Sequence, residues 1–194
     1  MQLLTYLIIL IFIFSLILLN KLQKYEVKYV KSELDENEYL VRDLPDKQKA
    51  SNLLSEIKIN MIKLTEYVYQ NKNTKYLEYA QYIEQLKTGI DKVIINESSD
   101  DSVYTSYSVN KGEQIVFCLR SKYTGKLHDL NLLMYVVIHE MAHVASPEYG
   151  HTQLFKKIFG FLLTVAMELD IYTKINFRFH PVEYCGLIIS ESIV

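Results

Sequence analysis

The pattern of hydrophobic positions begins with an unbroken apolar run. Leu3 to Leu19 is interrupted only by the polar residues Thr5, Tyr6 and Ser15. A helix rises about 1.5 Å per residue, so this run spans roughly 25 Å, which is enough for a thin bilayer. The N-terminal segment is therefore predicted to be a transmembrane helix.

Residues 1–20 form this predicted anchor, and two other interpretations stay open. A cleaved signal peptide would have basic residues before the apolar run and small residues at a cleavage site, and the chain has neither. A buried core helix would have one solvated face, and this segment is apolar all round. Four lysines follow the run and none precedes it: Lys21, Lys24, Lys28 and Lys31. The positive-inside rule then predicts a single-pass membrane protein whose remaining residues lie on the cytoplasmic side. The membrane would be that of the host or of a virion.

Beyond the apolar run the chain changes character twice. The charged segment 21–49 has no consistent period and is predicted to be a juxtamembrane stalk with a short strand at Tyr25–Val30. Residues 50–194 are predicted to be a folded domain, because apolar residues there recur every three or four positions, as in helices. The first helical stripe consists of Leu53, Ile57, Met61, Leu64 and Val68, and the second of Tyr76, Ala80, Ile83 and Leu86, before Gly89.

Short strands and two further helices are predicted in the rest of the domain. Lys92–Asn96 is typical of a short buried strand. Val103–Val109 and Gln114–Arg120 flank a turn sequence and are predicted to pair as a hairpin. An apolar helix runs from about Asp129, a good N-cap residue, to Val144, and a second ends near Asp170. Pro147 and Gly150 mark the turn between them.

Composition limits the possible functions. A hydrophobic fraction of 49% and a charged fraction of 23% exclude a disordered protein. The chain has 21 Lys and Arg against 23 Asp and Glu, a formal net charge of −2, and no basic stripe, so its charge does not support a nucleic-acid partner. Cys118 and Cys185 cannot form a disulfide framework and neither lies in a C-x-x-C pair, which favours a reducing compartment.

The predicted helix that ends near Val144 contains an H-E-x-x-H motif, from His139 through Glu140 to His143. Residues i and i+4 share one helix face about 6 Å apart along the axis, so two imidazoles there can bind one ion at about 2.0–2.1 Å. Glu140 can then reach a water on the open side of the ion. Apolar neighbours predict a buried helix, where a dication would compensate the polar groups. We therefore expect one Zn²⁺; the alternatives are a chance pattern and histidines satisfied by backbone and water.

A catalytic zinc site needs a third protein ligand, and His151 is the best candidate. The apolar residues that follow it at helical spacing, from Phe155 to Leu162, predict that its imidazole points inward. An ordinary core or capping histidine is the alternative for His151, and Glu168 is the rival ligand, as in thermolysin-like enzymes. His128 and His180 lie outside the motif helices and are expected in loops. The metzincin spacing would require a glycine and a histidine where the chain has Ser146 and Tyr149, so it does not fit.

The motif and its surroundings resemble the WLM/SprT-like zinc proteases, a group that includes proteases of DNA–protein crosslinks. The shared features are H-E-x-x-H, the Gly150-His151 pair and Phe155 four residues on. The chain is still more similar to membrane-anchored WLM-like metallopeptidases of large DNA viruses, through Val41–Gln48, Lys111–Glu113 and Pro181–Gly186.

The resemblance implies an α+β zincin-like fold: a small mixed sheet whose edge strand faces the cleft, an active-site helix and a following core helix, after an N-terminal transmembrane helix. It implies zinc on His139, His143 and His151, with Glu140 as the base. The turn before His151 is two residues longer than in the crosslink proteases. The anchor and the net charge argue against a DNA-dependent repair role.

These features predict a membrane-anchored zinc metalloendopeptidase that acts on a protein or peptide. The substrate would pair with a strand, preferably Val103–Val109 rather than Gln114–Arg120. An oxyanion donor is expected, with Tyr184 and His180 as guesses and a packed tyrosine as the alternative. The alternative function is a zinc-stabilised structural or virion-membrane protein whose activity is vestigial.

Overall fold

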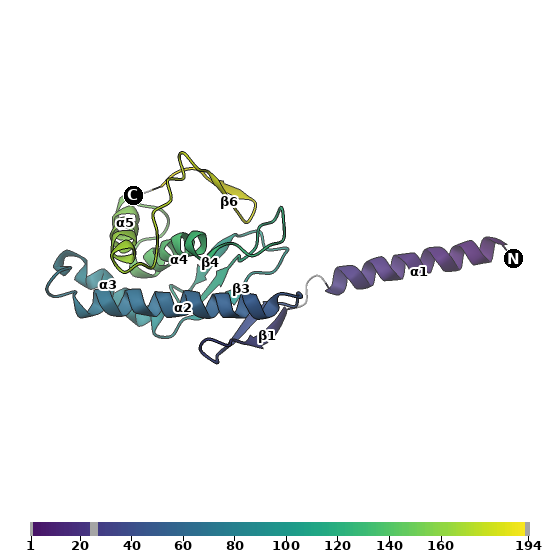
Figure 1. Cartoon of the computed structure of the whole chain (residues 1–194), viewed down its shortest axis with the longest axis horizontal. Helices are drawn as coiled ribbons and strands as arrows, with labels where there is room; N and C mark the ends of the chain where they lie inside the picture. Colours follow the sequence, from purple (N-terminus) through teal and green to yellow (C-terminus); the bar gives the residue numbers. More distant parts are fainter. Residues whose placement is uncertain (1, 24–26, 193–194) are drawn as a thin grey trace.

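The protein is of the α+β class, because its helices are combined with short strands that pair mostly antiparallel in small sheets. The computed structural model describes the backbone of residues 2–23 and 27–192, and the side chains of residues 6, 8–18 and 27–192. The elements are α1 (Gln2–Gln23), β1 (Val27–Lys31), β2 (Glu38–Arg42), α2 (Lys47–Gln70), η1 (Leu77–Tyr79), α3 (Ala80–Ile90), β3 (Ile94–Glu97), β4 (Ser106–Val109), β5 (Gln114–Phe117), α4 (Leu130–Ala145), α5 (Gln153–Glu168), β6 (Val182–Tyr184) and β7 (Leu187–Ile189). Figure 1 shows α1 extending away from the remaining elements, the folded unit of residues 27–192.

Helix α1 covers the predicted anchor. Its described side chains, at residues 6 and 8–18, are exposed, and nearly all of them are apolar. Within the described part of the chain, no helix combines the length and the apolar character needed to cross a bilayer. The predicted anchor, residues 1–20, falls partly outside the described side chains.

The predicted stalk contributes a hairpin to the folded unit. Strands β1 and β2 pair antiparallel, from Val27 opposite Arg42 to Lys31 opposite Glu38. The β2 side chains of Tyr39 and Val41 are buried in the core. The folded unit therefore begins at β1 rather than at residue 50, because alternate residues of β2 are apolar and face α2.

The two helices that follow have apolar faces close to the predicted ones, except that Leu54 rather than Leu53 is buried on the first, and Tyr76 lies before the second helix rather than on it. The buried face of α2 includes Leu54, Ile57, Met61, Leu64 and Val68. That of α3 consists of Ile83, Leu86 and Ile90. Both helices pack against α4, which places their apolar stripes in a single core.

A three-stranded mixed sheet lies beside these helices. Its strand order is β3-β5-β4, with β3 parallel to β5 and β4 antiparallel to it. The hairpin of β4 and β5 is the predicted one, with Ser106 opposite Phe117 and Val109 opposite Gln114. Strand β5 is central and its Ile115 is fully buried, whereas β4 is an edge strand of the described sheet.

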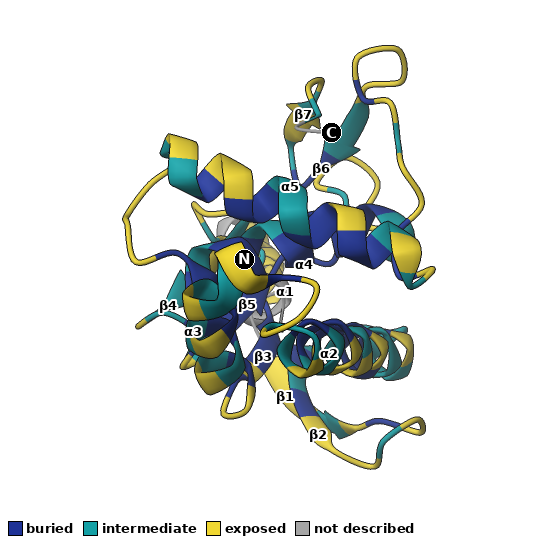
Figure 2. Ribbon diagram, turned by 90° about the vertical axis from the view of Figure 1, so that its left-hand side faces the viewer, coloured by how far each residue is buried: buried dark blue, intermediate teal, exposed yellow. Residues whose placement is uncertain are grey.

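Helix α4 occupies the centre of the folded unit, and Figure 2 shows its ribbon mostly in the colour of buried residues. Asp129 caps it as predicted, because its carboxylate accepts a hydrogen bond from the backbone N–H of Leu132 at 3.0 Å. The end of α4 packs closely against Gly89, where a Cβ would lie 2.4 Å from a methyl of Val144. A side chain at position 89 would therefore push α4 away from α3.

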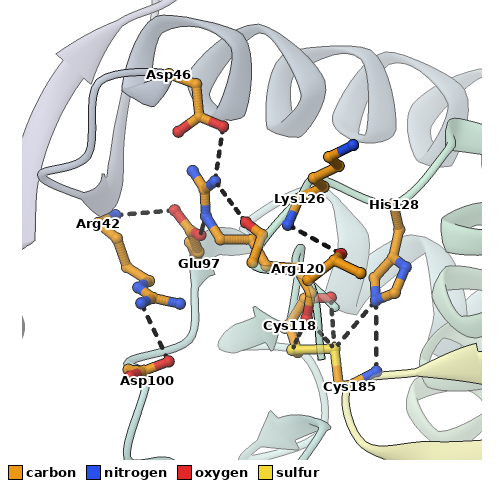
Figure 3. Close-up of polar contacts among 11 residues, drawn as sticks. Arg42, Asp46, Glu97, Asp100, Cys118, Arg120, Lys126, His128 and Cys185 are labelled. Atoms are coloured by element: carbon orange, nitrogen blue, oxygen red, sulfur yellow. Dashed lines mark hydrogen bonds and ion pairs between the residues drawn. A yellow bond between two sulfur atoms is a disulfide. The ribbon is translucent and has the colours of Figure 1, made fainter. Parts of the chain in front are cut away.

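A buried ion pair joins four parts of the fold (Figure 3). The Arg120 guanidinium donates to Glu97 and to Asp46, each at 2.7 Å, and the Arg120 and Glu97 side chains are almost inaccessible to solvent. Glu97 also accepts the backbone N–H of Arg42 at 2.8 Å. The segment after β5 is thereby tied to β3, to the end of β2 and to the start of α2.

The two cysteines form a disulfide, which is a correction to the sequence analysis. Cys118, directly after β5, is bonded to Cys185 in the turn between β6 and β7. The two cysteines are 67 positions apart in the sequence, and they meet because the C-terminal hairpin returns to the sheet. Cysteine usage therefore does not support the reducing compartment inferred from it.

Candidate metal centre and its cavity

Helix α4 presents His139 and His143 on one face, one turn apart. Their imidazole Nε2 atoms lie 3.2 Å from each other, and their rings are 4.9 Å apart between centroids. Both side chains are half-buried. The i, i+4 spacing that the motif predicted therefore brings the two nitrogens together without distortion of the helix.

The third histidine reaches the same point from the turn before α5. The Nε2 of His151 lies 3.0 Å from that of His139 and 3.2 Å from that of His143. Thr152 follows it as the N-cap of α5 and accepts a hydrogen bond from the backbone N–H of Phe155 at 3.2 Å. His151 is thus held at the junction of a turn and a capped helix.

Two side chains from other elements hold the turn that leads to His151. Gln85 of α3 donates to the carbonyl of Val144 at 2.9 Å. Lys111, between β4 and β5, donates to the carbonyls of Ser146 and Pro147 at 2.9 and 2.8 Å. These bonds satisfy carbonyls at the end of α4 and in the turn after it, and so they orient the turn that leads to His151.

The three nitrogens suit one metal ion. The three side chains form the metal-capable group found among the described residues. Nitrogens 3.0–3.2 Å apart leave room for one ion at about 2.0–2.1 Å from each. Each neutral imidazole has a single N–H, so three ring nitrogens in a triangle cannot all be satisfied by one another. A cation satisfies all three lone pairs, and the donor set therefore fits zinc.

The environment keeps the α4 histidines neutral. Burial, then the neighbouring imidazoles, lowers the pKa of His139 to about 3. Burial, then His151 and Lys111, lowers the pKa of His143 to about 4. Phe155 provides the apolar surroundings, because its ring lies 4.2–4.9 Å from all three imidazoles. Neutral imidazoles bind a metal without first losing a proton.

Glu140 is the buried carboxyl beside this group. Only 6% of its surface is exposed, and burial raises its pKa to about 7. It lines a cavity of about 700 Å³ together with the three histidines, residues of β4, the 148–151 turn, Tyr184 and Ile189. A carboxyl with this pKa beside a metal site can both accept and donate a proton near neutral pH.

Of the two guesses for an oxyanion donor, only Tyr184 lines this cavity. Its hydroxyl lies 2.6 Å from the hydroxyl of Ser106 in β4. Burial raises the pKa of Tyr184, and the nearby Glu140 raises it further, so the phenol keeps its proton. His180 is exposed in the segment before β6. Tyr184 had been named in the sequence analysis only as a guess, and Ser106 had not been singled out.

The other candidate ligands lie elsewhere. Glu168 is at the far end of α5, where it pairs with Lys75 at 2.7 Å, and it is outside the metal-capable group. His128 is in the loop before α4, as expected, and lies beside the disulfide, with its Nε2 3.6 Å from the sulfur of Cys185. The structure thus assembles His151, and not Glu168, with the motif histidines.

Comparisons with known proteins find relatives among viruses. The chain is 47% identical over 176 residues to "uncharacterized protein R325" of Acanthamoeba polyphaga mimivirus. That alignment covers 91% of this chain and 89% of the mimivirus protein. It is 44% identical over 69 residues to "uncharacterized protein 136R" of Invertebrate iridescent virus 6, and 40% identical over 67 residues to "uncharacterized protein 042R" of Invertebrate iridescent virus 3. These shorter matches cover 38% and 42% of the iridescent virus proteins.

No family model matches the chain. Among solved structures, Wss1 from Saccharomyces cerevisiae is similar with a TM-score of 0.48 and 19% identity, over 67% of this chain and 86% of that one. A Wss1 mutant gives a TM-score of 0.47, also at 19% identity, over 68% of this chain and 91% of that one.

Proposed function

The chain belongs to the same family as protein R325 of Acanthamoeba polyphaga mimivirus, and from its candidate metal centre we propose that it is a zinc-dependent endopeptidase. The observation that carries the proposal is the convergence of three imidazole nitrogens, 3.0–3.2 Å apart, beside a buried carboxyl in a cavity open to a substrate. The resemblance of the motif to WLM/SprT-like proteases supports the same assignment.

His139, His143 and His151 would hold the ion, which when bound supplies Lewis-acid polarisation of the scissile carbonyl and of a water. Glu140 takes a proton from the attacking water and passes it to the nitrogen of the leaving amine. Burial raises its pKa, which favours proton uptake from the water, and a general acid–base group must then release that proton to the amine. The sign of that shift follows from burial, which disfavours the carboxylate.

The substrate of this peptidase is an extended peptide that pairs with β4. Support comes from the strand order, in which β4 is the edge strand of the described sheet, and from Ser106, Tyr107 and Ser108, which line the cavity. An edge strand offers unpaired backbone groups to a partner strand. Tyr184, on the β6–β7 hairpin, supplies an O–H to the negative charge that develops on the carbonyl oxygen.

The substitution Glu140→Gln tests this function. It keeps the size of the side chain and the three ligands but removes the base, so peptide cleavage should fall by about 10³-fold or more while zinc stoichiometry is unchanged. Glu148→Gln is the matched control, because Glu148 lines the same cavity but is exposed, and it should cleave almost as the parent protein does.

Unchanged cleavage by the Glu140→Gln protein would remove Glu140 from the mechanism. A zinc-loaded parent protein that cleaves nothing in a peptide library would favour the alternative, a zinc-stabilised structural or virion-membrane protein.

We also propose that α1 attaches the protein to a membrane, with the folded unit on the cytoplasmic side. The support is the exposed and nearly all apolar side chains of residues 8–18 and the lysines that follow the apolar run in the sequence. A disulfide is instead typical of oxidising compartments. A glycosylation acceptor introduced into the exposed turn 33–37 decides between a cytoplasmic and a lumenal placement, because modification there would place the folded unit on the lumenal side. Recovery of the protein without membranes would contradict the anchor itself.

A further inference from the structure

The β6–β7 hairpin forms one side of the cavity but is not part of the main sheet. Its two strands pair only with each other among the described strands. Tyr184 and Ile189 line the cavity, whereas Leu187 and Ile188 are more than half exposed. The position of Tyr184 therefore depends on whatever fastens this small hairpin to the rest of the fold.

Most of the described polar bonds between the hairpin and the rest of the fold are long. The backbone N–H of Lys122 donates to Glu183 at 3.4 Å, that of Cys185 donates to His128 at 3.4 Å, and the hydroxyl of Tyr123 donates to the Gly186 carbonyl at 3.5 Å. These distances are at the upper limit for hydrogen bonds and so indicate weak attachments.

Tyr184 and Cys185 are buried in the core, and of the polar and covalent attachments two are strong and join the same two segments. One is the Tyr184–Ser106 hydrogen bond of 2.6 Å, and the other is the disulfide of the next residue, Cys185, to Cys118. Cys118 is itself beside Ser106, because its backbone N–H donates to the Ser106 hydroxyl at 3.2 Å. The covalent bond therefore fixes the separation that the hydrogen bond needs (Figure 3 shows the disulfide beside His128).

The backbone of the turn is also unusual for a cysteine. The turn between β6 and β7 consists of Cys185 and Gly186, with φ angles of 51° and 87°. Such two-residue hairpin turns favour asparagine, aspartate or glycine, which tolerate positive φ. Cys185 is strained there, so the chain places a disulfide at a turn position that other residues would fill more easily.

We propose that the Cys118–Cys185 disulfide is a positioning element of the proposed peptidase site, which holds Tyr184 against β4, and that its reduction slows hydrolysis without releasing zinc. The proposal rests on the proposed function. A dithiol reductant attacks one sulfur, the S–S bond breaks, and the protein gains two thiols while the dithiol becomes a disulfide. The reductant has a route, because a second cavity of about 430 Å³ is lined by Cys185, Lys122 and the exposed Val103 and Tyr104.

The experiment compares the zinc-loaded, oxidised full chain with the double variant Cys118→Ser/Cys185→Ser. The double variant should show a kcat lower by about tenfold or more, with KM changed much less and zinc stoichiometry unchanged. Dithiothreitol followed by its removal should lower the kcat of the parent protein to the same level, reoxidation should restore it, and the double variant should not respond. Zinc is measured after each treatment.

The substitution Tyr184→Phe shows whether the disulfide acts through Tyr184. Tyr184→Phe should lower kcat by about tenfold or more, and adding the two serine substitutions should lower it less than about twofold further, because the hydroxyl to be positioned is already absent. Independent, multiplying effects would overturn the proposal and leave the disulfide a structural bond.

The remaining outcomes separate the two proposals. An oxidised, zinc-loaded parent protein without activity contradicts the peptidase function itself. An active parent protein whose double variant is equally active, or loses its zinc, overturns the positioning role and leaves the peptidase function standing. Circular dichroism of the double variant confirms that it is folded before its kinetics are interpreted.

Discussion

Two sides of the same cavity are built in different ways. The helical side, consisting of α4, α5 and the turn between them, carries the three histidines and Glu140 and is packed into the core, as Figure 2 shows for α4. The hairpin side, β6–β7, carries Tyr184 and Ile189; only Tyr184 and Cys185 of its residues are buried in the core, and its strong polar and covalent attachments are one hydrogen bond and one disulfide. The contrast indicates that the ligand geometry is independent of the hairpin, whereas the geometry presented to a substrate depends on it.

The largest effect is expected from His151→Ala on the helical side. Removal of one of three ligands should lower zinc affinity by more than about 100-fold. Glu168→Ala, on α5 but paired with Lys75 away from the group, should leave zinc affinity nearly unchanged. Competition with a chelator measures both. The opposite ranking would show that Glu168, and not His151, is the third ligand.

Phe155→Ala tests whether core packing supports the ligands. The Phe155 side chain is 1% exposed and contacts all three imidazoles, so its removal should cost about 3–5 kcal/mol in the free energy of unfolding. Phe161→Ala is the matched control on the same helix. Phe161 is half-buried and its ring stacks on that of Tyr79 with the centroids 4.0 Å apart, so its removal should lower the free energy of unfolding by about 1–2 kcal/mol. Urea denaturation measures both costs. Equal losses of unfolding free energy for Phe155→Ala and Phe161→Ala would show that Phe155 has no special role in packing the ligands.

Burial on the helical side also predicts a pH dependence for the metal-free protein. The folded pKa values of His139 and His143, about 3 and 4, lie below the ordinary 6.5, so stability is lost as the pH falls below about 6.5. Glu140 acts in the opposite direction, because its raised pKa of about 7 favours the folded state as the pH falls. Two histidines outweigh one carboxyl, so the metal-free protein should show a net loss of stability as the pH falls from 6.5 to 5.

Urea denaturation of the chelator-treated protein measures this dependence. The Glu140→Gln protein should lose stability more steeply, because the opposing contribution is removed. A metal-free protein that becomes more stable on acidification over this range would show that the histidines are not buried as the structure has them.

The smallest effect is expected on the hairpin side, from Ile189→Ala. Ile189 lines the cavity but is only half-buried, so its truncation should cost about 1 kcal/mol or less in stability and raise KM by a few-fold. Zinc affinity should not change. A loss of zinc would contradict the independence of the two sides, and steady-state kinetics with metal analysis distinguishes the outcomes.

Periodic segments were predictable and isolated contacts were not. The helices α2 and α4, the β4–β5 hairpin and the Asp129 cap follow from local patterns, so their prediction needed no partner. The β1–β2 hairpin was predicted as a stalk because its charged outer face conceals two buried positions, Tyr39 and Val41. The Arg120–Glu97 pair has no local signal, since its members are buried only by elements distant in sequence.

The sequence by itself determined the candidate ligands on α4, because a helix places residues i and i+4 on one face wherever it lies. The choice of His151 over Glu168 was decided by the tertiary structure, in which the capped start of α5, and not its far end, faces α4. The pairing of Cys118 with Cys185 was decided in the same way. Spacing along one element is a local property, whereas contacts between elements depend on how the whole core packs.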